Sequence, residues 1–282
     1  VHVEGRLAAL KLLVVADFFL SETAQLADVV LPSAQWAEED GTMTNLEGRV
    51  IRRRRAVAAP EGVRTDIQIL CGLADALGKR HAFAFDGSAA VFEELRKATR
   101  GGAADYSGIT YERLDDSDGI FWPCPSVDHP GTPRLFASTF PTASGRALFH
   151  AAPHQAIADE RTDEFPLHLT TGRVLAHYQS GTQTRRVTAL RDASPEPHAE
   201  IHPATARRAG IRSGDQVTVA TRRGAAVFRA KLTSAIREDV IFVPFHWGGM
   251  QSVNRLTNPA LDPISGMPEF KVCAAECRRD DD

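Results

Sequence analysis

Residues 169–187 read LTTGRVLAHYQSGTQTRRV, in which an apolar, β-prone run ends and a polar segment without carboxylates follows. Small residues and hydroxyls let a backbone approach a ligand closely, and hydrogen-bond donors without competing acids suit phosphate. Arginines can supply bidentate contacts to anionic oxygens. They stand at Arg173, Arg185 and Arg186. The pattern therefore predicts an anion-binding loop, with a strand that ends in a solvated loop as the alternative.

The chain length, composition and charge bound the class of protein. At 282 residues, with 43% hydrophobic and 24% charged residues, the chain has room for two globular domains. A net charge of −3 argues against nucleic-acid or membrane binding. No apolar run reaches the ~18 residues of a membrane span. Because the chain begins without Met or a signal sequence, we expect it to be the tail of a longer protein.

Four cysteines are scattered along the chain, at Cys71, Cys124, Cys273 and Cys277. The last two are spaced C-x3-C without a neighbouring cluster of cysteine or histidine, whereas a metal site needs about four ligands. We therefore predict idle thiols in a reducing compartment, no metal site, and a cytoplasmic protein.

The N-terminal part alternates apolar runs with polar connections. Residues 11–16 and 27–32 predict two buried strands, and residues 21–26 predict a helix between them, so this part reads as a βαβ unit with a parallel sheet. Asp17 follows the first strand, where a carboxylate can either cap the junction or face a ligand crevice. These patterns predict an α/β fold.

Residues 36–100 continue this portion. Asp40-Gly41 predicts a turn, and the acids at 38–40 are expected to pair with the arginines at 52–55 on a solvated strand edge. Residues 67–77 predict a helix that Asp66 caps and Gly78 ends, and residues 89–97 predict another helix.

After residue 101 the sequence is rich in Gly, Pro, Ser and Asp, and it predicts long loops to about residue 164. From Phe165 the pattern becomes β, with strands expected near 215–220, 225–232 and 239–244 and a short helix at 204–209. Strands at this spacing suggest a barrel. His202 is interpreted as structural and His246 as a rim or core residue.

Several motifs resemble one family in the correct order along the chain. T-G-R-V-L at 171–175 followed by S-G-T-x-T-R-R at 180–186 resembles the C-terminal domain of the molybdopterin oxidoreductases, the DMSO reductase superfamily. A-D-V-V-L-P at 27–32 and W-x-E-x-x-G-T-x-T-N-x-E-x-R at 36–49 resemble the third domain of the same superfamily. The chain is therefore similar to the C-terminal part of these enzymes.

The resemblance implies the domains and the site. It implies a partial α/β domain at 1–100 with part of a parallel sheet, connecting loops at 101–164, and a β-rich, double-psi barrel-like domain at 165–282. It also implies binding of molybdopterin guanine dinucleotide with molybdenum, and no catalytic or metal-ligating residue in this chain. The implied cofactor contacts are Asp17, Asp66, Thr171, Gly172, Arg173, Val174, Leu175, His177, Tyr178, Gln179, Ser180, Thr182, Phe245, Asn254 and Lys271.

The resemblance is greatest to cytoplasmic assimilatory nitrate reductases, which implies reduction of nitrate to nitrite. A 4Fe–4S cluster and the metal-ligating residue are expected only in missing N-terminal domains of the same protein, so this chain alone is expected to be inactive. Electrons would come from a donor protein or domain. A formate dehydrogenase subunit is one alternative, and a stand-alone, non-redox β-barrel binding module is another.

Overall fold

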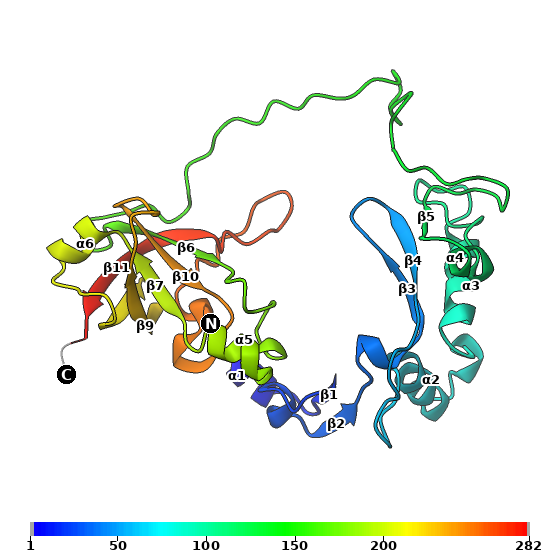
Figure 1. The fold of residues 1–282 in the computed structure, drawn as a ribbon, viewed down its shortest axis with the longest axis horizontal. Helices are drawn as coiled ribbons and strands as arrows, with labels where there is room; N and C mark the ends of the chain where they lie inside the picture. Colours follow the sequence, from blue (N-terminus) through cyan, green and yellow to red (C-terminus); the bar gives the residue numbers. More distant parts are fainter. Residues whose placement is uncertain (1–2, 281–282) are drawn as a thin grey trace. The chain divides into compact units, whose positions relative to one another are not determined.

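The computed structural model describes residues 3–280, so residues 1–2 and 281–282, at the outer ends of the predicted first and last domains, lie outside the described residues. The chain folds into two compact units. One unit is Glu4–His150, here called the α/β unit, and the other contains the chain from Ala151 onward, here called the barrel unit (Figure 1).

The α/β unit contains a two-stranded parallel sheet. After α1 (Val3–Ala8), β1 (Val14–Asp17) pairs with β2 (Val29–Pro32), which confirms the parallel sheet. The predicted helix between them is a single 3-10 turn, η1 (Ala24–Leu26), because so short a segment cannot offset the cost of helix nucleation. Burial of the strands was a wrong expectation, since Val14 is 43% and Val29 is 42% exposed.

A second, antiparallel sheet has the order β3-β4-β5. A 3-10 turn, η2 (Trp36–Glu38), precedes it, and its strands are β3 (Gly41–Thr44), β4 (Arg49–Arg53) and β5 (Ile120–Phe121). The predicted Asp40-Gly41 turn is wrong, since Gly41 begins β3. The hairpin instead turns at Asn45, whose side-chain oxygen accepts from the amides of Glu47 and Arg49 at 3.0 Å each, a local bond that stabilises turns.

The arginines that follow this turn are more enclosed than the sequence indicates. Their strand, β4, lies between β3 and β5, but β5 pairs only with Arg49 and Val50, so the part that holds Arg52 and Arg53 pairs with β3 alone and is a strand edge, as predicted. Pairing with the upstream acids is confirmed, because Arg53 lies 3.0 Å from Glu39 and Arg52 lies 3.6 Å from Asp40. The Arg52 guanidinium also stacks over the Tyr111 ring at 4.1 Å.

The helices of this unit are α2 (Asp66–Ala76), α3 (Ser88–Ala98) and α4 (Tyr111–Asp115), with the 3-10 turn η3 (Arg80–Ala82). Both α2 and α3 were predicted. The cap of α2 is Thr65 rather than Asp66, because the Thr65 hydroxyl accepts from the Gln68 amide and the Gln68 side chain accepts from the Thr65 amide. A small core gathers buried side chains from the two antiparallel strands, the helices and the predicted loop region: Val50, Phe92, Ile109, Leu114, Ile120 and Cys124.

The barrel unit is built on a closed barrel of six strands in the order β10-β6-β11-β8-β9-β7. The strands are β6 (Leu167–Gly172), β7 (His198–Ile201), β8 (Gln216–Thr221), β9 (Gly224–Leu232), β10 (Val240–Pro244) and β11 (Val272–Arg279). Two pairs, β6–β10 and β7–β9, are parallel and the others are antiparallel. The predicted α/β portion followed by a double-psi barrel-like domain is confirmed.

Short helices connect the strands: η4 (Thr184–Arg186), α5 (Thr188–Ala193), α6 (Pro203–Arg208), η5 (Gly249–Gln251) and η6 (Val253–Arg255). His202 has the structural role that the sequence predicts, because its Nδ1 accepts from the Ala204 amide at the start of α6. The apolar residues that alternate along the strands, including Leu169, Ile201 and Phe228, fill the barrel with a single core.

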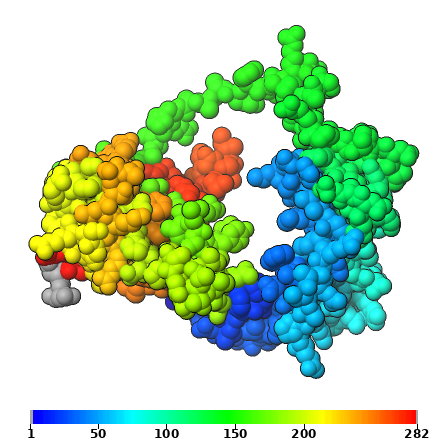
Figure 2. Space-filling view, in the orientation of Figure 1, coloured from blue at the N-terminus to red at the C-terminus, as the bar shows by residue number. Residues whose placement is uncertain are grey.

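A long segment with little regular structure joins β5 to the barrel. Around residues 146–156 its side chains are exposed, and Figure 2 shows this stretch in green as a thin strand of atoms. Its attachment to the barrel is Asp159, a buried carboxylate that accepts from Arg222, from Arg223 and from the Ala274 amide. The segment is therefore fixed to the barrel by a charged, hydrogen-bonded cluster.

All four cysteines are free thiols, as predicted. Burial raises the pKa of Cys273 to about 11 and that of Cys277 to about 12, so both are protonated near neutral pH. Within residues 3–280 no group of histidine, cysteine and carboxylate side chains could hold a metal ion. No helix in that range is long and apolar enough to cross a membrane.

Candidate cofactor-binding site

The ends of three strands bring a charged and aromatic cluster together at one end of the barrel. Strands β6 and β10 are parallel and end in register at Gly172 and Pro244, so the residues that follow them, Arg173 and Phe245, emerge side by side. Lys271 immediately precedes β11, which runs antiparallel to β6 and therefore begins at the same end. Arg173, Phe245 and Lys271 therefore lie together because of the strand register, although they are far apart in the sequence.

The geometry of this cluster places two cations around one ring. The Arg173 guanidinium lies 5.3 Å and the Lys271 ammonium 5.6 Å from the centre of the Phe245 ring. Lys271 also donates to the carbonyl oxygen of Thr171 at 3.0 Å. No ion pair among the described residues involves Arg173 or Lys271, so both retain donors for an anion. We call these three residues, Arg173, Phe245 and Lys271, the cation–ring cluster.

The loop Arg173–Gly181 leaves the barrel at this cluster. Several of its predicted ligand-binding side chains are exposed, among them Leu175 at 109% and Tyr178 at 70%. The hydroxyls of Ser180 and Thr182 lie at the outer surface, 2.9 Å from each other. Between Glu164 and Asp192 the sequence contains no acidic residue, so the loop offers donors without a competing carboxylate.

Part of the predicted site turns inward. The Thr171 side chain is buried, with its hydroxyl 3.5 Å from the Phe270 carbonyl oxygen. His177 is also buried, and its ring nitrogens contact the Thr184 hydroxyl at 3.2 Å and the Ser194 carbonyl oxygen at 2.8 Å. These buried side chains contact the backbone and side chains around the loop and support its conformation.

Backbone amides of the loop are also engaged within the protein. The Val174 amide donates to Nε2 of His246 at 2.9 Å, and the Tyr178 amide donates to the Thr184 hydroxyl at 3.2 Å. At these two positions the loop therefore offers no backbone donor to a ligand. The donors that remain for an anion include the cations of the cation–ring cluster and the exposed hydroxyls.

Close contacts with β10 and the residues after it require glycine at two positions. A Cβ on Gly172 would lie 2.6 Å from the Phe242 ring, and a Cβ on Gly181 would lie 2.6 Å from the His246 carbonyl oxygen. Gly181 also has a φ of +73°, in the left-handed region that favours glycine. Both ends of the loop are thus held tightly against β10 and the residues after it.

Three predicted contacts are not tied to this cluster. Asp17 and Asp66 belong to the α/β unit. The Asp17 carboxylate accepts from the Ser21 hydroxyl at 2.7 Å and from the Phe18 amide at 2.8 Å, while Asp66 is exposed in the first turn of α2. Asn254 is exposed on η6, and within residues 3–280 no hydrogen bond joins its amide to the loop.

His246 is the main residue that the sequence did not place at the site. It is fully buried, and it contacts the loop at Val174 and at Gln179. In β10 the inward-facing residues are Ile241 and Val243, so a period of two would place Phe245 inward and His246 outward. Phe245 does pack against the barrel core, and His246 is buried as well because the loop Arg173–Gly181 covers it.

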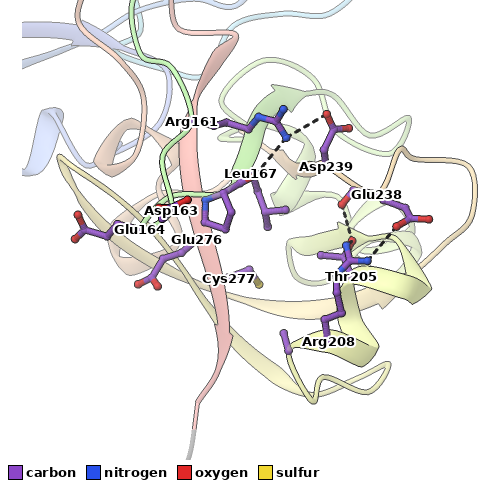
Figure 3. Close-up of a pocket in the computed structure, with 12 residues that line it drawn as sticks. Arg161, Asp163, Glu164, Leu167, Thr205, Arg208, Glu238, Asp239, Glu276 and Cys277 are labelled. Atoms are coloured by element: carbon purple, nitrogen blue, oxygen red, sulfur yellow. Dashed lines mark hydrogen bonds and ion pairs between the residues drawn. The ribbon is translucent and has the colours of Figure 1, made fainter.

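Two cavities flank the barrel. A groove of about 580 Å³ borders the loop, between Val174, Leu175 and Ala176 on one side and α5 with Phe242 and Pro244 on the other. A second pocket of about 570 Å³ lies where β6 and β10 begin, and is thus at the opposite end of these strands from the loop. It is rich in acids, and Figure 3 shows Arg161 paired with Asp239 and Arg208 paired with Glu238 there.

The residues of the cation–ring cluster fit an anionic dinucleotide. Two cations without ion-pair partners in the described part of the chain suit phosphate oxygens, and the partly buried aromatic ring between them suits a flat heterocycle. The groove beside the loop adds an apolar wall of the kind that ligand sites use. The pocket at the other end, where carboxylates outnumber arginines, has the wrong charge for phosphate.

Comparison with known families agrees with this chemistry. The family model for the molybdopterin dinucleotide-binding domain matches residues 167–274, and that for molybdopterin oxidoreductase matches residues 1–76. The first of these ranges covers all of the barrel strands up to the start of β11, together with the cation–ring cluster.

Individual relatives match nearly the whole chain. It is 46% identical over 96% of its length to the assimilatory nitrate reductase catalytic subunit of Bacillus subtilis. It is 44% identical over 99% of its length to the F420-dependent formate dehydrogenase 1 subunit alpha of Methanococcus maripaludis. The chain spans 39% and 40% of these two proteins. Acetylene hydratase from Pelobacter acetylenicus shares the fold, with a TM-score of 0.70, 22% identity and coverage of 96% of this chain and 40% of its own.

Proposed function

Because the chain belongs to the molybdopterin oxidoreductases, we propose that its barrel unit binds a molybdopterin guanine dinucleotide and that the whole protein reduces nitrate to nitrite. The observation that carries the cofactor part is the cation–ring cluster, where Arg173 and Lys271 flank Phe245 without an acidic partner among residues 3–280. The nitrate part is supported by the 46% identity to an assimilatory nitrate reductase.

In this proposal the residues of the loop and of the cation–ring cluster have distinct roles. Arg173 and Lys271 neutralise phosphate oxygens, Phe245 stacks on a flat ring, and the hydroxyls of Ser180 and Thr182 add neutral donors. Gly172, Val174, Leu175, Tyr178 and Gln179 contribute the loop surface, with Thr171 and His177 supporting it from within. Asp17, Asp66 and Asn254 remain proposed contacts. When bound, the cofactor supplies the two electrons with which nitrate, taking up two protons, becomes nitrite and water.

The remaining parts of the machinery are proposed to lie outside these 282 residues. The relatives are about two and a half times as long, and we assign the 4Fe–4S cluster, the metal-ligating residue and the contact with an electron donor to that further length. The chain by itself is then expected to bind cofactor without turning over substrate. The same proposal includes domain boundaries at residues 100 and 164 and a cytoplasmic location.

The test of cofactor binding is chemical analysis of the whole protein. We expect molybdenum and guanine nucleotide in near-stoichiometric amounts. Arg173→Gln and Lys271→Met each remove a charged donor, which is worth about 1.5–3 kcal/mol, so we expect roughly a tenfold or greater loss of affinity for the cofactor. Arg212→Gln is the matched control, because Arg212 is exposed in the turn before β8 and forms no ion pair among the described residues.

The controls separate the candidate functions. Equal loss from Arg173→Gln and Arg212→Gln would contradict the assignment of the cluster. A whole protein without molybdenum or guanine nucleotide would favour the non-redox binding module. Formate oxidation is the second candidate reaction, because identity to a formate dehydrogenase subunit is 44%. Reduced-dye assays that yield nitrite from nitrate support the first reaction, and dye reduction by formate supports the second.

A further inference from the structure

One buried side chain contacts both arms of the loop Arg173–Gly181. Nε2 of His246 accepts from the Val174 amide at 2.9 Å, near the start of the loop. Nδ1 of the same ring lies 2.5 Å from the carbonyl oxygen of Gln179, near its end. Since Nε2 accepts and a carbonyl can only accept, this pattern assigns the proton to Nδ1 and makes the ring neutral.

The ring of His246 has little freedom to leave this position. It is fully buried, with Trp247 at 5.8 Å and His177 at 5.8 Å between ring centres. Its own carbonyl oxygen lies where a Cβ on Gly181 would collide. Gln179 has a φ of +49°, a conformation that non-glycine residues adopt rarely and that surrounding contacts must hold. The hydrogen bond to the Gln179 carbonyl is one such contact.

We propose that His246 is a positioning residue that closes the loop into the conformation in which Arg173 lies beside Phe245 and Lys271. This inference rests on the proposed cofactor-binding function. Arg173 is adjacent to Val174, so fixing the Val174 amide fixes the direction in which the arginine leaves β6. His246 follows Phe245 in the chain, and the same short segment therefore supplies the stacking ring and the group that positions the loop.

Protonation of His246 would oppose this arrangement. A proton on Nε2 would point at the Val174 amide, another donor. Burial holds the pKa of His246 below its ordinary value of 6.5, and the nearby His177, Arg173 and Arg185 lower it further, against the hydrogen bond to Gln179 that raises it. Below pH 6.5 the unfolded or opened state then binds more protons than the closed state. Loop closure is therefore complete above that pH and weakens as the pH falls below it.

The experiment compares three variants of the purified protein with its cofactor. His246→Leu removes both hydrogen bonds. His246→Gln places an amide oxygen near the Nε2 position and keeps an acceptor for Val174, and His246→Asn places a donor near the Nδ1 position for the Gln179 carbonyl. His202→Leu is the matched control, because His202 also accepts one backbone amide, but at α6. Hydrogen exchange of the loop amides, corrected for the intrinsic rates, and guanine nucleotide content are measured together.

The expected result is a graded effect. In His246→Leu we expect exchange of the Val174 amide to rise about tenfold, as loss of one backbone hydrogen bond implies, with lower nucleotide content. In His246→Gln the Val174 amide should stay better protected than in His246→Asn. Loop exchange in the unmodified protein should accelerate below pH 6.5, the ordinary histidine value, and this acceleration should be absent from His246→Gln. The control should change neither readout.

Two results would overturn the inference while leaving the proposed function intact. One is unchanged loop exchange in His246→Leu, and the other is faster exchange with undiminished nucleotide. Absence of nucleotide from the unmodified protein would instead overturn the proposed function, and this inference with it. If fast exchange of the β8 and β9 amides shows that His246→Leu has not folded, the other two variants test the inference. Better protection of the Val174 amide in His246→Gln than in His246→Asn would support it, and the reverse order would overturn it.

Discussion

The two units use apolar strands in different ways. In the barrel unit six strands close on themselves, and Leu169, Ile201 and Val217 in its core are at most 1% exposed. In the α/β unit the strands form two separate small sheets, and Val14 and Val29 in the parallel pair remain 43% and 42% exposed. The sequence of β2, V-V-L-P, is about as apolar as that of β10, V-I-F-V-P, so composition alone does not explain the difference.

Within these 282 residues, burial of the strands follows closure of the sheet rather than apolarity of the strand. A closed barrel has no edge strand and an enclosed interior, whereas a parallel pair needs layers on both faces to be covered. The candidate cofactor site depends on the closed barrel. Its cation–ring cluster is built on strand ends that closure holds in register, and this gives the cluster a rigid support.

The largest expected effect comes from opening a cavity in the barrel. Leu169→Ala removes a side chain that is 1% exposed in the centre of β6, and we expect a loss of about 2–5 kcal/mol in the free energy of unfolding. Unfolding can be followed by fluorescence of Trp247, the tryptophan of the barrel unit, in a background where Trp36 and Trp122 are replaced by phenylalanine.

The control for this substitution is Leu73→Ala on α2, where the side chain is 45% exposed. We expect a change of about 0.5 kcal/mol or less, as for most surface substitutions. A parallel denaturant titration, in a background that keeps Trp122 of the α/β unit and replaces Trp36 and Trp247 by phenylalanine, measures it. A loss as large as that of Leu169→Ala would mean that the α/β unit is packed as tightly as the barrel, and the comparison would break.

A smaller effect is expected where the connecting segment attaches to the barrel. Asp159→Asn removes the charge that Arg222 and Arg223 share, and leaves two guanidinium groups facing a neutral amide. Breaking a fully buried pair costs about 3–5 kcal/mol, but the Arg222 side chain is 39% exposed, so we expect about 2–3 kcal/mol. Trp247 fluorescence in denaturant measures this loss.

Asp192→Asn is the matched control, because the Asp192 and Arg191 side chains are 62% and 53% exposed. An ion pair of this kind contributes about 0–1 kcal/mol. Equal effects of the two substitutions would show that the segment around Asp159 is not part of the folded barrel. A larger effect of Asp159→Asn would agree with the place of this segment in the barrel unit.

The elements that the sequence predicts well have strong local signals. Alternating apolar residues mark β6 and β8, a continuous apolar run marks β10, and the capping residue and Gly78 mark the two ends of α2. Strand β11 was missed because V-C-A-A-E-C-R-R has few β-branched or aromatic residues, and its place in the barrel depends on pairing with β6 and β8. Tertiary contacts also enclose Arg52 of β4, whose guanidinium lies over the Tyr111 ring at 4.1 Å.

The candidate site also has a part that the sequence predicts and a part that depends on tertiary structure. Motif resemblance predicts the loop Arg173–Ser180, and with it the two cations and the ring of the cluster. Their proximity could not be derived from spacing, because it depends on the register of β10 and β11 against β6. His246 was interpreted as a rim or core residue, in agreement with its burial, but its contacts with Val174 and Gln179 depend on the direction of the chain after Pro244 and were not predicted. Local sequence patterns therefore predict which residues form a strand, whereas the pairing of the strands determines which strand ends lie together.

The smallest expected effect tests whether the two units respond independently. Thr65→Ala removes the hydroxyl that accepts from the Gln68 amide at the start of α2, and loss of such a cap costs about 1 kcal/mol. Because Leu70 and Leu73 leave one side of α2 exposed, this loss should appear as faster hydrogen exchange in the first turns of the helix. Thr65→Ser keeps the acceptor and should restore protection. The barrel transition, followed through Trp247, should not move, since its core contains no residue of α2. If it does move, the two units unfold as one cooperative body, and closure of the barrel does not by itself account for its stability.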